Sequence, residues 1–260
     1  MTNFLWVIFP YIAMAVFVVG LIWRYRYDKF GWTTRSSQLY ESKMLRVGSP
    51  LFHFGILFAL LGHIMGLVIP KSWTDALGIE QHTYHLVAVI GGLVSGVMII
   101  VGFAILVFRR RTVKSVFNAT TVNDKVMYLV LGIVIATGMW NTVSTTISDA
   151  YNYREGVSPY FRSVFSFQPE AGLIADAPIQ FRLHAFTAFL LVLIWPFTRL
   201  VHVFSAPFGY LNRPYIVYRS AGDSPSSMNR TKAPTGTWDK PGWDGNRPGT
   251  RKGEKTHSDH

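Results

Sequence analysis

The sequence predicts an all-α fold, namely a polytopic membrane helix bundle with five transmembrane helices. Only 15% of its 260 residues are charged and half are hydrophobic, whereas about a quarter of the residues of a soluble domain are charged. Long uncharged apolar runs accompany this shortage of charge. Because the chain contains no cysteine, disulfide scaffolds, iron–sulfur clusters and thiolate zinc sites within it are excluded.

Five segments are long enough to cross a membrane as helices, because a spanning helix needs about 20 apolar residues. None of the first four contains a charged residue, and the continuous apolar character of all five rules out alternating barrel strands. No basic residue precedes the first segment, which favours a retained helix over a cleaved signal peptide. The segments are Phe4–Trp23, Pro50–Pro70, Tyr84–Phe108, Val126–Thr146 and Leu183–Phe204.

The distribution of Lys and Arg predicts the orientation of the bundle. Residues 24–49, residues 109–125 and the chain beyond Phe204 together hold 20 of them, whereas residues 71–83 and 149–182 hold four. By the positive-inside rule, the N-terminus lies outside and the C-terminus lies in the cytoplasm. The net charge of +11 is then an orientation signal and a contact with anionic membrane lipid, and no nucleic-acid partner is expected.

The composition divides the chain into two regions. Residues 1–220 are predicted to form the five-helix transmembrane domain. Residues 221–260 are rich in Gly, Pro, Ser, Thr, Lys and Asp, with few apolar side chains. Because such a segment cannot bury a core, we expect a disordered, basic cytoplasmic tail.

Four of the eight histidines lie inside predicted spans: His53 and His63 in the second, and His184 and His202 in the fifth. An ionisable side chain in a span is costly and by default indicates function. Because the two helices run in opposite directions, depth pairs His63 with His184 near the outer side and His53 with His202 near the inner side. Two facing histidines are a usual way for a helix bundle to hold a haem.

The axial distance between the two histidines of the fifth segment does not agree with that between the two histidines of the second segment. His184 and His202 are 18 residues apart, which puts them on one face of a continuous helix and about 27 Å apart along it. His53 and His63 are ten residues apart, or about 15 Å.

Zinc is the competing metal, but membrane zinc sites usually add Asp, Glu or Cys ligands, which these spans lack.

Two arginines lie close to these histidines in the sequence. Arg182 precedes His184 by two residues, and Arg199 lies one helical turn before His202. Both are placed to meet haem propionates. Arg199 has an alternative role, in which its side chain extends to lipid phosphates at the membrane edge.

The residues around the histidines carry a specific family resemblance. The stretches concerned are Ser36-Ser37-Gln38, Leu51-Phe52-His53-x-Gly55-Ile56-Leu57 with Gly62-His63, and Phe181-Arg182-Leu183-His184 with Pro196-Phe197-x-Arg199-Leu200-Val201-His202. Together they resemble the gamma subunit of respiratory nitrate reductase, the membrane cytochrome b of the quinol:nitrate oxidoreductase. The resemblance covers residues 5 to 219 and the same five helices.

This resemblance implies a function for the chain. Two b-type haems would be held by His63 with His184 and by His53 with His202. Quinol, either menaquinol or ubiquinol, would be oxidised near the outer face of the bacterial cytoplasmic membrane. Electrons would pass to a cytoplasmic iron–sulfur beta subunit and then to a molybdenum-containing alpha subunit that reduces nitrate.

The resemblance also places the quinol site at the start of the third helix. The family can have a lysine there, and His85 occupies this position in the present sequence. A histidine can take the quinol proton because its pKa is near neutral. The alternative is that His85 only orients the quinol ring through a hydrogen bond.

Two other functions are compatible with the sequence. The chain could be a dihaem cytochrome b of another quinone-linked oxidoreductase, such as a hydrogenase, a formate dehydrogenase or a heterodisulfide-type reductase. It could also be a transporter or proton channel that uses intramembrane histidines. The latter predicts a protein without a visible chromophore.

Overall fold

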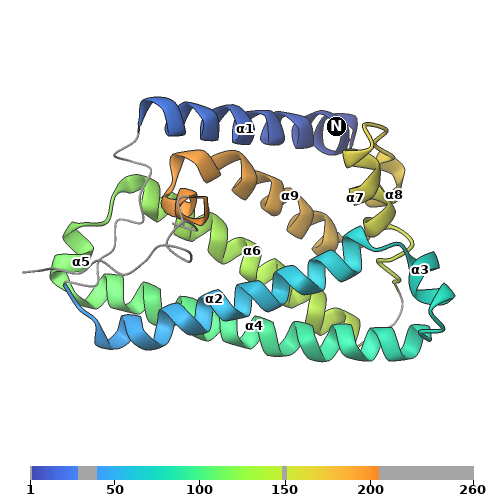
Figure 1. Ribbon diagram of the computed structural model, residues 1–260, viewed down its shortest axis with the longest axis horizontal. Helices are drawn as coiled ribbons and strands as arrows, with labels where there is room; N and C mark the ends of the chain where they lie inside the picture. Colours follow the sequence, from blue (N-terminus) through green and yellow to red (C-terminus); the bar gives the residue numbers. More distant parts are fainter. Residues whose placement is uncertain (1, 29–39, 148–150, 205–260) are drawn as a thin grey trace, which may run out of the picture. The chain divides into compact units, whose positions relative to one another are not determined.

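The computed structural model describes residues 2–28, 40–147 and 151–204, in which every regular element is helical. Five helices in this part of the chain are long and apolar enough to cross a membrane, which confirms the predicted fold class (Figure 1). The predicted tail, residues 221–260, lies outside the described residues. The spans are Phe4–Tyr27, Lys43–Val68, Gln81–Thr112, Val122–Ile147 and Ile179–Phe197.

Each span corresponds to one long helix, and two of them contain a π-helical turn. The first comprises η1 (Phe4–Ile8) and α1 (Phe9–Tyr27), and the second α2 (Lys43–His63) and η2 (Ile64–Val68). The others are α4 (Gln81–Thr112), α6 (Val122–Ile147), and α9 (Ile179–Ile194) with its 3-10 turn η3 (Trp195–Phe197). Short helices connect them, namely α3 (Lys71–Ala76), α5 (Lys114–Asn118), α7 (Val157–Phe165) and α8 (Ala171–Ala175), and η4 (Arg199–Val203) follows the fifth span.

Small residues let the spans approach one another closely. A Cβ atom on Gly102 of α4 would lie 2.6 Å from the backbone nitrogen of Phe52 on α2. Gly92 of α4 likewise faces Thr142 of α6, because a Cβ atom on this glycine would lie 3.0 Å from the threonine methyl group. In a membrane, where lipid is as apolar as a leucine side chain, such close packing is a main source of helix association.

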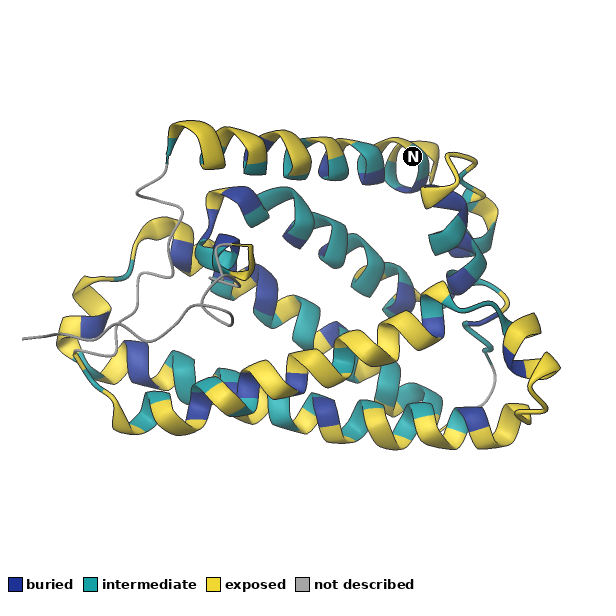
Figure 2. Cartoon of the chain, viewed as in Figure 1, coloured by how far each residue is buried: buried dark blue, intermediate teal, exposed yellow. Residues whose placement is uncertain are grey.

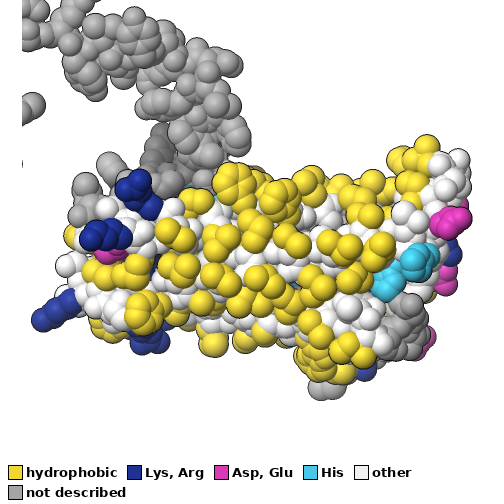
Figure 3. All heavy atoms as spheres, turned by 90° about the horizontal axis from the view of Figure 1, so that it is seen from below, with side chains coloured by type: hydrophobic (Ala, Val, Ile, Leu, Met, Phe, Trp, Pro, Cys, Tyr) yellow, Lys and Arg dark blue, Asp and Glu magenta, His cyan; other side chains and the backbone are white. Residues whose placement is uncertain are grey.

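The described surface has the character expected of a membrane protein. Exposed residues run along α1, α2 and α4 (Figure 2), and many of them are large and hydrophobic, including Phe54, Phe58 and Leu61 on α2. On the face shown in Figure 3, hydrophobic side chains cover the middle, while Lys and Arg gather at one end and His at the other. An apolar band that lies between two polar ends fits a surface that faces lipid.

The prediction of one continuous fifth helix through His202 is wrong. α9 ends at Ile194, and the chain continues through η3, an extended Thr198 (φ −113°, ψ 176°) and η4. Pro196 explains the break, because proline lacks the N–H that an α-helix needs and clashes with the preceding turn. The axial estimate of about 27 Å therefore does not apply, since it assumed α-helical geometry throughout.

The long segment between α6 and α9 forms a small core with the start of the first span. Tyr160 of α7 is 2% exposed, and its hydroxyl donates a hydrogen bond to the carbonyl of Trp6 at 2.9 Å. Ser158 and Arg162 of the same helix donate to the carbonyls of Gly66 and Leu67 in η2. These contacts fix the start of the first span and the end of the second against α7.

Candidate functional site

The structure brings the four histidines together as two pairs, although the fifth span ends at Phe197 and His202 lies beyond it in η4. The ring centroids of His63 and His184 are 6.0 Å apart, and those of His53 and His202 are also 6.0 Å apart. A metal–imidazole bond is about 2 Å long and a ring nitrogen lies about 1 Å from the ring centre, so two rings on one metal have centroids about 6 Å apart. Both pairs therefore have the separation that two axial ligands of one iron need.

Hydrogen bonds at Nδ1 orient three of the rings. Nδ1 of His53 lies 2.7 Å from the carbonyl of Ser49, and Nδ1 of His63 lies 2.6 Å from that of Ala59. Nδ1 of His202 lies 2.7 Å from the carbonyl of Arg199. A carbonyl oxygen can only accept, so Nδ1 carries the proton in each ring and Nε2 carries the lone pair. This is the tautomer in which Nε2 can ligate a metal.

The fourth ring is held by a different helix. Nδ1 of His184 lies 3.1 Å from Oγ1 of Thr137 on α6. A Cβ atom on the neighbouring Gly138 would lie 2.9 Å from Cε1 of the same ring. Reasoning from the sequence missed both residues, although a polar Thr beside a Gly within an apolar span was a usable signal.

The described residues contain no group of three or more His, Asp, Glu or Cys side chains that could hold a metal. A metal at either pair would take two protein ligands from this part of the chain. An iron porphyrin needs two axial ligands because its ring supplies the remaining four, whereas protein-bound zinc normally has three or four protein ligands. The donor set therefore fits haem better than zinc.

The two predicted propionate arginines have different surroundings. Arg199 forms a bidentate pair with Asp124 at the start of α6, with Nε–Oδ1 and Nη2–Oδ2 distances of 2.6 and 2.7 Å. Asp124 is 4% exposed, and this pair anchors η4, which carries His202, to α6. By contrast, the buried Nε of Arg182 has no hydrogen-bond partner among the described residues. Arg182, two residues before His184 in α9, thus retains a buried donor.

His85 lies in the first turns of α4 and is partly buried. The preceding residue, Tyr84, is buried beneath Arg154, whose guanidinium carbon lies 3.8 Å from the centre of the tyrosine ring. Arg154 also donates to the hydroxyl of Thr74 at 2.5 Å and to the amide oxygen of Gln81 at 3.1 Å. These contacts hold the start of α4, and with it His85, against the 151–157 segment.

An ion pair ties the same segment to the end of the second span. Nζ of Lys71 lies 2.6 Å from Oε1 of Glu155. The hydrogen bond from this ammonium group lowers the pKa of the Glu155 carboxyl below its usual range. The pair is exposed to solvent, so its role is to restrain the connection and not to stabilise a buried charge.

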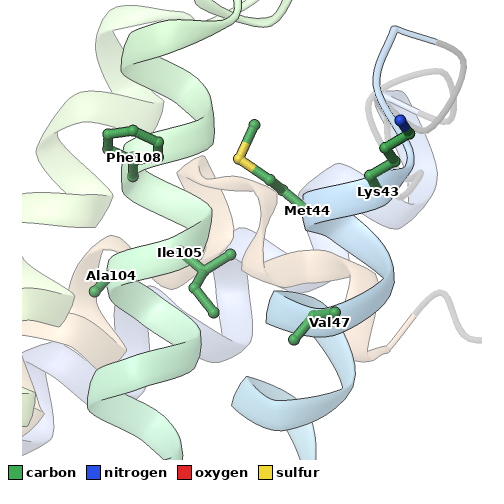
Figure 4. Close-up of a pocket in the computed structure, with 6 residues that line it drawn as sticks. All are labelled: Lys43, Met44, Val47, Ala104, Ile105 and Phe108. Atoms are coloured by element: carbon green, nitrogen blue, oxygen red, sulfur yellow. The ribbon is translucent and has the colours of Figure 1, made fainter.

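A groove of about 560 Å³ opens between the beginning of α2 and the end of α4 (Figure 4). Its lining is apolar apart from Lys43 and comprises Lys43, Met44, Val47, Ala104, Ile105 and Phe108. No histidine lines it, so this groove is separate from both histidine pairs.

The fold and the paired rings define a class of protein: a membrane helix bundle that presents two facing histidine pairs. Comparison with known families gives the assignment within that class. The chain belongs to the nitrate reductase gamma subunit family, because the model of that family matches residues 2–221.

Individual relatives agree with this assignment. The chain is 41% identical to the nitrate reductase gamma chain of Bacillus subtilis, over 84% of this chain and 97% of that protein. It is 33% identical to the respiratory nitrate reductase 1 gamma chain of Escherichia coli, over 85% of this chain and 98% of that protein. It is 55% identical to the nitrate reductase-like protein NarX of Mycobacterium tuberculosis over 85% of this chain, but spans only 34% of that longer protein.

Proposed function

We propose that this chain is the membrane cytochrome b subunit of a respiratory nitrate reductase, in the bacterial cytoplasmic membrane with its N-terminus outside. It oxidises quinol near the outer face and passes the electrons inward. They leave to an iron–sulfur beta subunit and then reach a molybdenum-containing alpha subunit, where nitrate is reduced. The observation that carries this proposal is the pair of 6.0 Å ring separations in a member of this family.

The residues divide between two cofactor sites. His63 and His184 hold the outer b-type haem, and His53 and His202 hold the inner one. When bound, such a haem supplies reversible one-electron transfer at an iron that has no open coordination position. Arg182, whose buried Nε has no hydrogen-bond partner in the described part of the chain, would bind an outer propionate. Arg199 uses two of its five N–H donors on Asp124 and offers the remainder to an inner propionate.

Haem content tests this proposal directly. We expect two b-type haems per chain, bound without thioether links because the sequence has no cysteine. A pyridine haemochrome assay on the purified complex, with the chain quantified separately, measures the number. One haem per chain would reject the paired arrangement, and a chain without haem would favour the histidine-based transporter instead.

The quinol site is proposed beside the outer haem, with His85 in hydrogen-bond reach of the quinol ring. Oxidation there releases protons outside while electrons move inward, so charge is separated across the membrane. Moving one charge across 100 mV is worth about 2.3 kcal/mol. The start of α4 suits this role because Arg154 and Tyr84 hold it in place.

Replacing His85 with alanine should slow quinol oxidation while both haems remain bound. A general base typically contributes about 10²–10⁴ in rate, so we expect a loss of that size if His85 takes the proton. A loss of only a few-fold would indicate that His85 orients the ring. His82→Ala, three residues earlier on the same helix, is the control. If the His85→Ala variant oxidised quinol as fast as the unmodified complex between about pH 6 and pH 8, His85 would be excluded from the site.

A further inference from the structure

The partner of His184 at Nδ1 differs from the partners of the other three paired histidines. His53, His63 and His202 bond there to carbonyls three or four residues earlier in the chain, and His53 also lies 3.3 Å from the hydroxyl of Ser49. His184 instead meets α6, where the hydroxyl of Thr137, 47 positions away in sequence, lies 3.1 Å from Nδ1 and the carbonyl of Val134 also contacts the imidazole. A side chain can be replaced, so this contact can be removed without disturbing a backbone.

The direction of this hydrogen bond follows from the other partners of the hydroxyl. Oγ1 of Thr137 lies 2.8 Å from the carbonyl of Ile133 and 3.1 Å from that of Val134. A hydroxyl has one proton, and both carbonyls can only accept it. Oγ1 therefore donates into its own helix and accepts the Nδ1 proton of His184, together with the carbonyl of Val134. This leaves the lone pair on Nε2.

Thr137 and Gly138 together restrict the ring of His184. Thr137 is 8% exposed, so its hydroxyl has little competition from solvent. Gly138 brings the backbone of α6 against the ring, because a side chain there would start 2.9 Å from Cε1. The hydrogen bond sets the rotation of the imidazole, and the glycine supplies the space in which the ring lies.

We propose that Thr137 is a positioning residue that orients His184 as an axial ligand and lowers the reduction potential of the outer haem. This inference rests on the proposed dihaem function. An acceptor at Nδ1 makes the imidazole a more basic ligand, and a more basic ligand favours the oxidised, more positively charged iron. The hydroxyl is itself polarised, because it donates to a carbonyl at the same time.

Thr137→Val tests this inference, because valine keeps the shape of threonine and removes the hydroxyl. In a redox titration of the purified complex followed by visible and EPR spectroscopy, the outer haem should become easier to reduce. A tenfold change in its reduction equilibrium corresponds to about 59 mV, and we expect a shift of that order. The inner haem should keep its potential, because Nδ1 of His53 and Nδ1 of His202 bond to the carbonyls of Ser49 and Arg199 and not to Thr137.

Two further variants separate positioning from a general structural role. Thr137→Ser restores the hydroxyl and should return the outer potential to its original value. Thr145→Val removes a hydroxyl of the same helix that bonds to the carbonyls of Asn141 and Thr142, and it should change neither haem. Selective loss of the outer haem in Thr137→Val, with rescue by Thr137→Ser, would also support the inference.

Three results would overturn the inference. These are an unchanged outer potential and EPR signal in Thr137→Val, an equal shift in Thr137→Ser, and loss of both haems from Thr137→Val. The unmodified complex distinguishes this failure from failure of the proposed function. If that complex lacks two haems, the dihaem function is rejected together with the role of Thr137.

Discussion

Replacing His53 with alanine should empty the inner haem site and leave the outer haem bound. Each pair has its rings 6.0 Å apart, whereas His53 and His63 are separated by ten residues of α2, or about 15 Å. A histidine of one pair cannot therefore substitute in the other. His202→Ala should remove the same haem, while His63→Ala and His184→Ala should remove the outer one.

Haem quantification combined with EPR spectroscopy of the four variants measures this selectivity. His82→Ala is the matched control, because His82 is an exposed histidine at the beginning of α4 and belongs to neither pair. Both haems should remain in that variant. If His53→Ala and His184→Ala removed the same spectroscopic signal, the pairing of ligands proposed here would be incorrect.

Replacing Gly102 with alanine should destabilise the bundle substantially. The added Cβ would lie 2.6 Å from the nitrogen and 2.8 Å from the Cα of Phe52. These are backbone atoms, so α2 and α4 must move apart to relieve the contact. Overpacking of this kind typically costs about 1–3 kcal/mol, and we expect a lower midpoint of thermal unfolding in detergent. Because His53 follows Phe52 directly, weaker retention of the inner haem should accompany the loss.

The same helix provides a control for this substitution. A Cβ on Gly91 of α4 would meet no described atom within 4 Å beyond its two chain neighbours and the nearby backbone of its own helix. Gly91→Ala should therefore be neutral, or stabilising by up to about 1 kcal/mol because alanine favours a helix more than glycine does. Equal unfolding midpoints for Gly102→Ala and the unmodified chain would contradict the proposed close contact between α2 and α4.

Much of the fold could be predicted from the sequence because a bilayer imposes a simple rule. Every backbone polar group in hydrocarbon needs an internal partner, so a long uncharged apolar run is read directly as a helix. All five predicted segments overlap helices that are long and apolar enough to span a membrane, with ends that differ by several residues. Polar residues beside the apolar runs, such as Lys43 and Asn123, extend the helices beyond their hydrophobic parts.

The pairing of the histidine rings could also be predicted, because depth in a membrane follows from position along a helix and from its direction. The path of the chain between His184 and His202 could not. Pro196 indicated a possible interruption, but a proline can kink a helix or end it. In the structure the chain around this proline contacts other helices, including α1, whose Arg24 donates to the carbonyl of Pro196.

The sequence by itself determined the existence of five long apolar helices, the asymmetry of charge and the four histidines that form the two pairs. Only the tertiary structure decided which groups surround those histidines. Thr137 and Gly138 meet His184 across 47 and 46 positions, and Asp124 meets Arg199 across 75. Helical periodicity relates residues within one element, whereas such contacts depend on the rotation and separation of two packed helices. Those quantities are set by side-chain packing along the whole interface, which no local pattern contains.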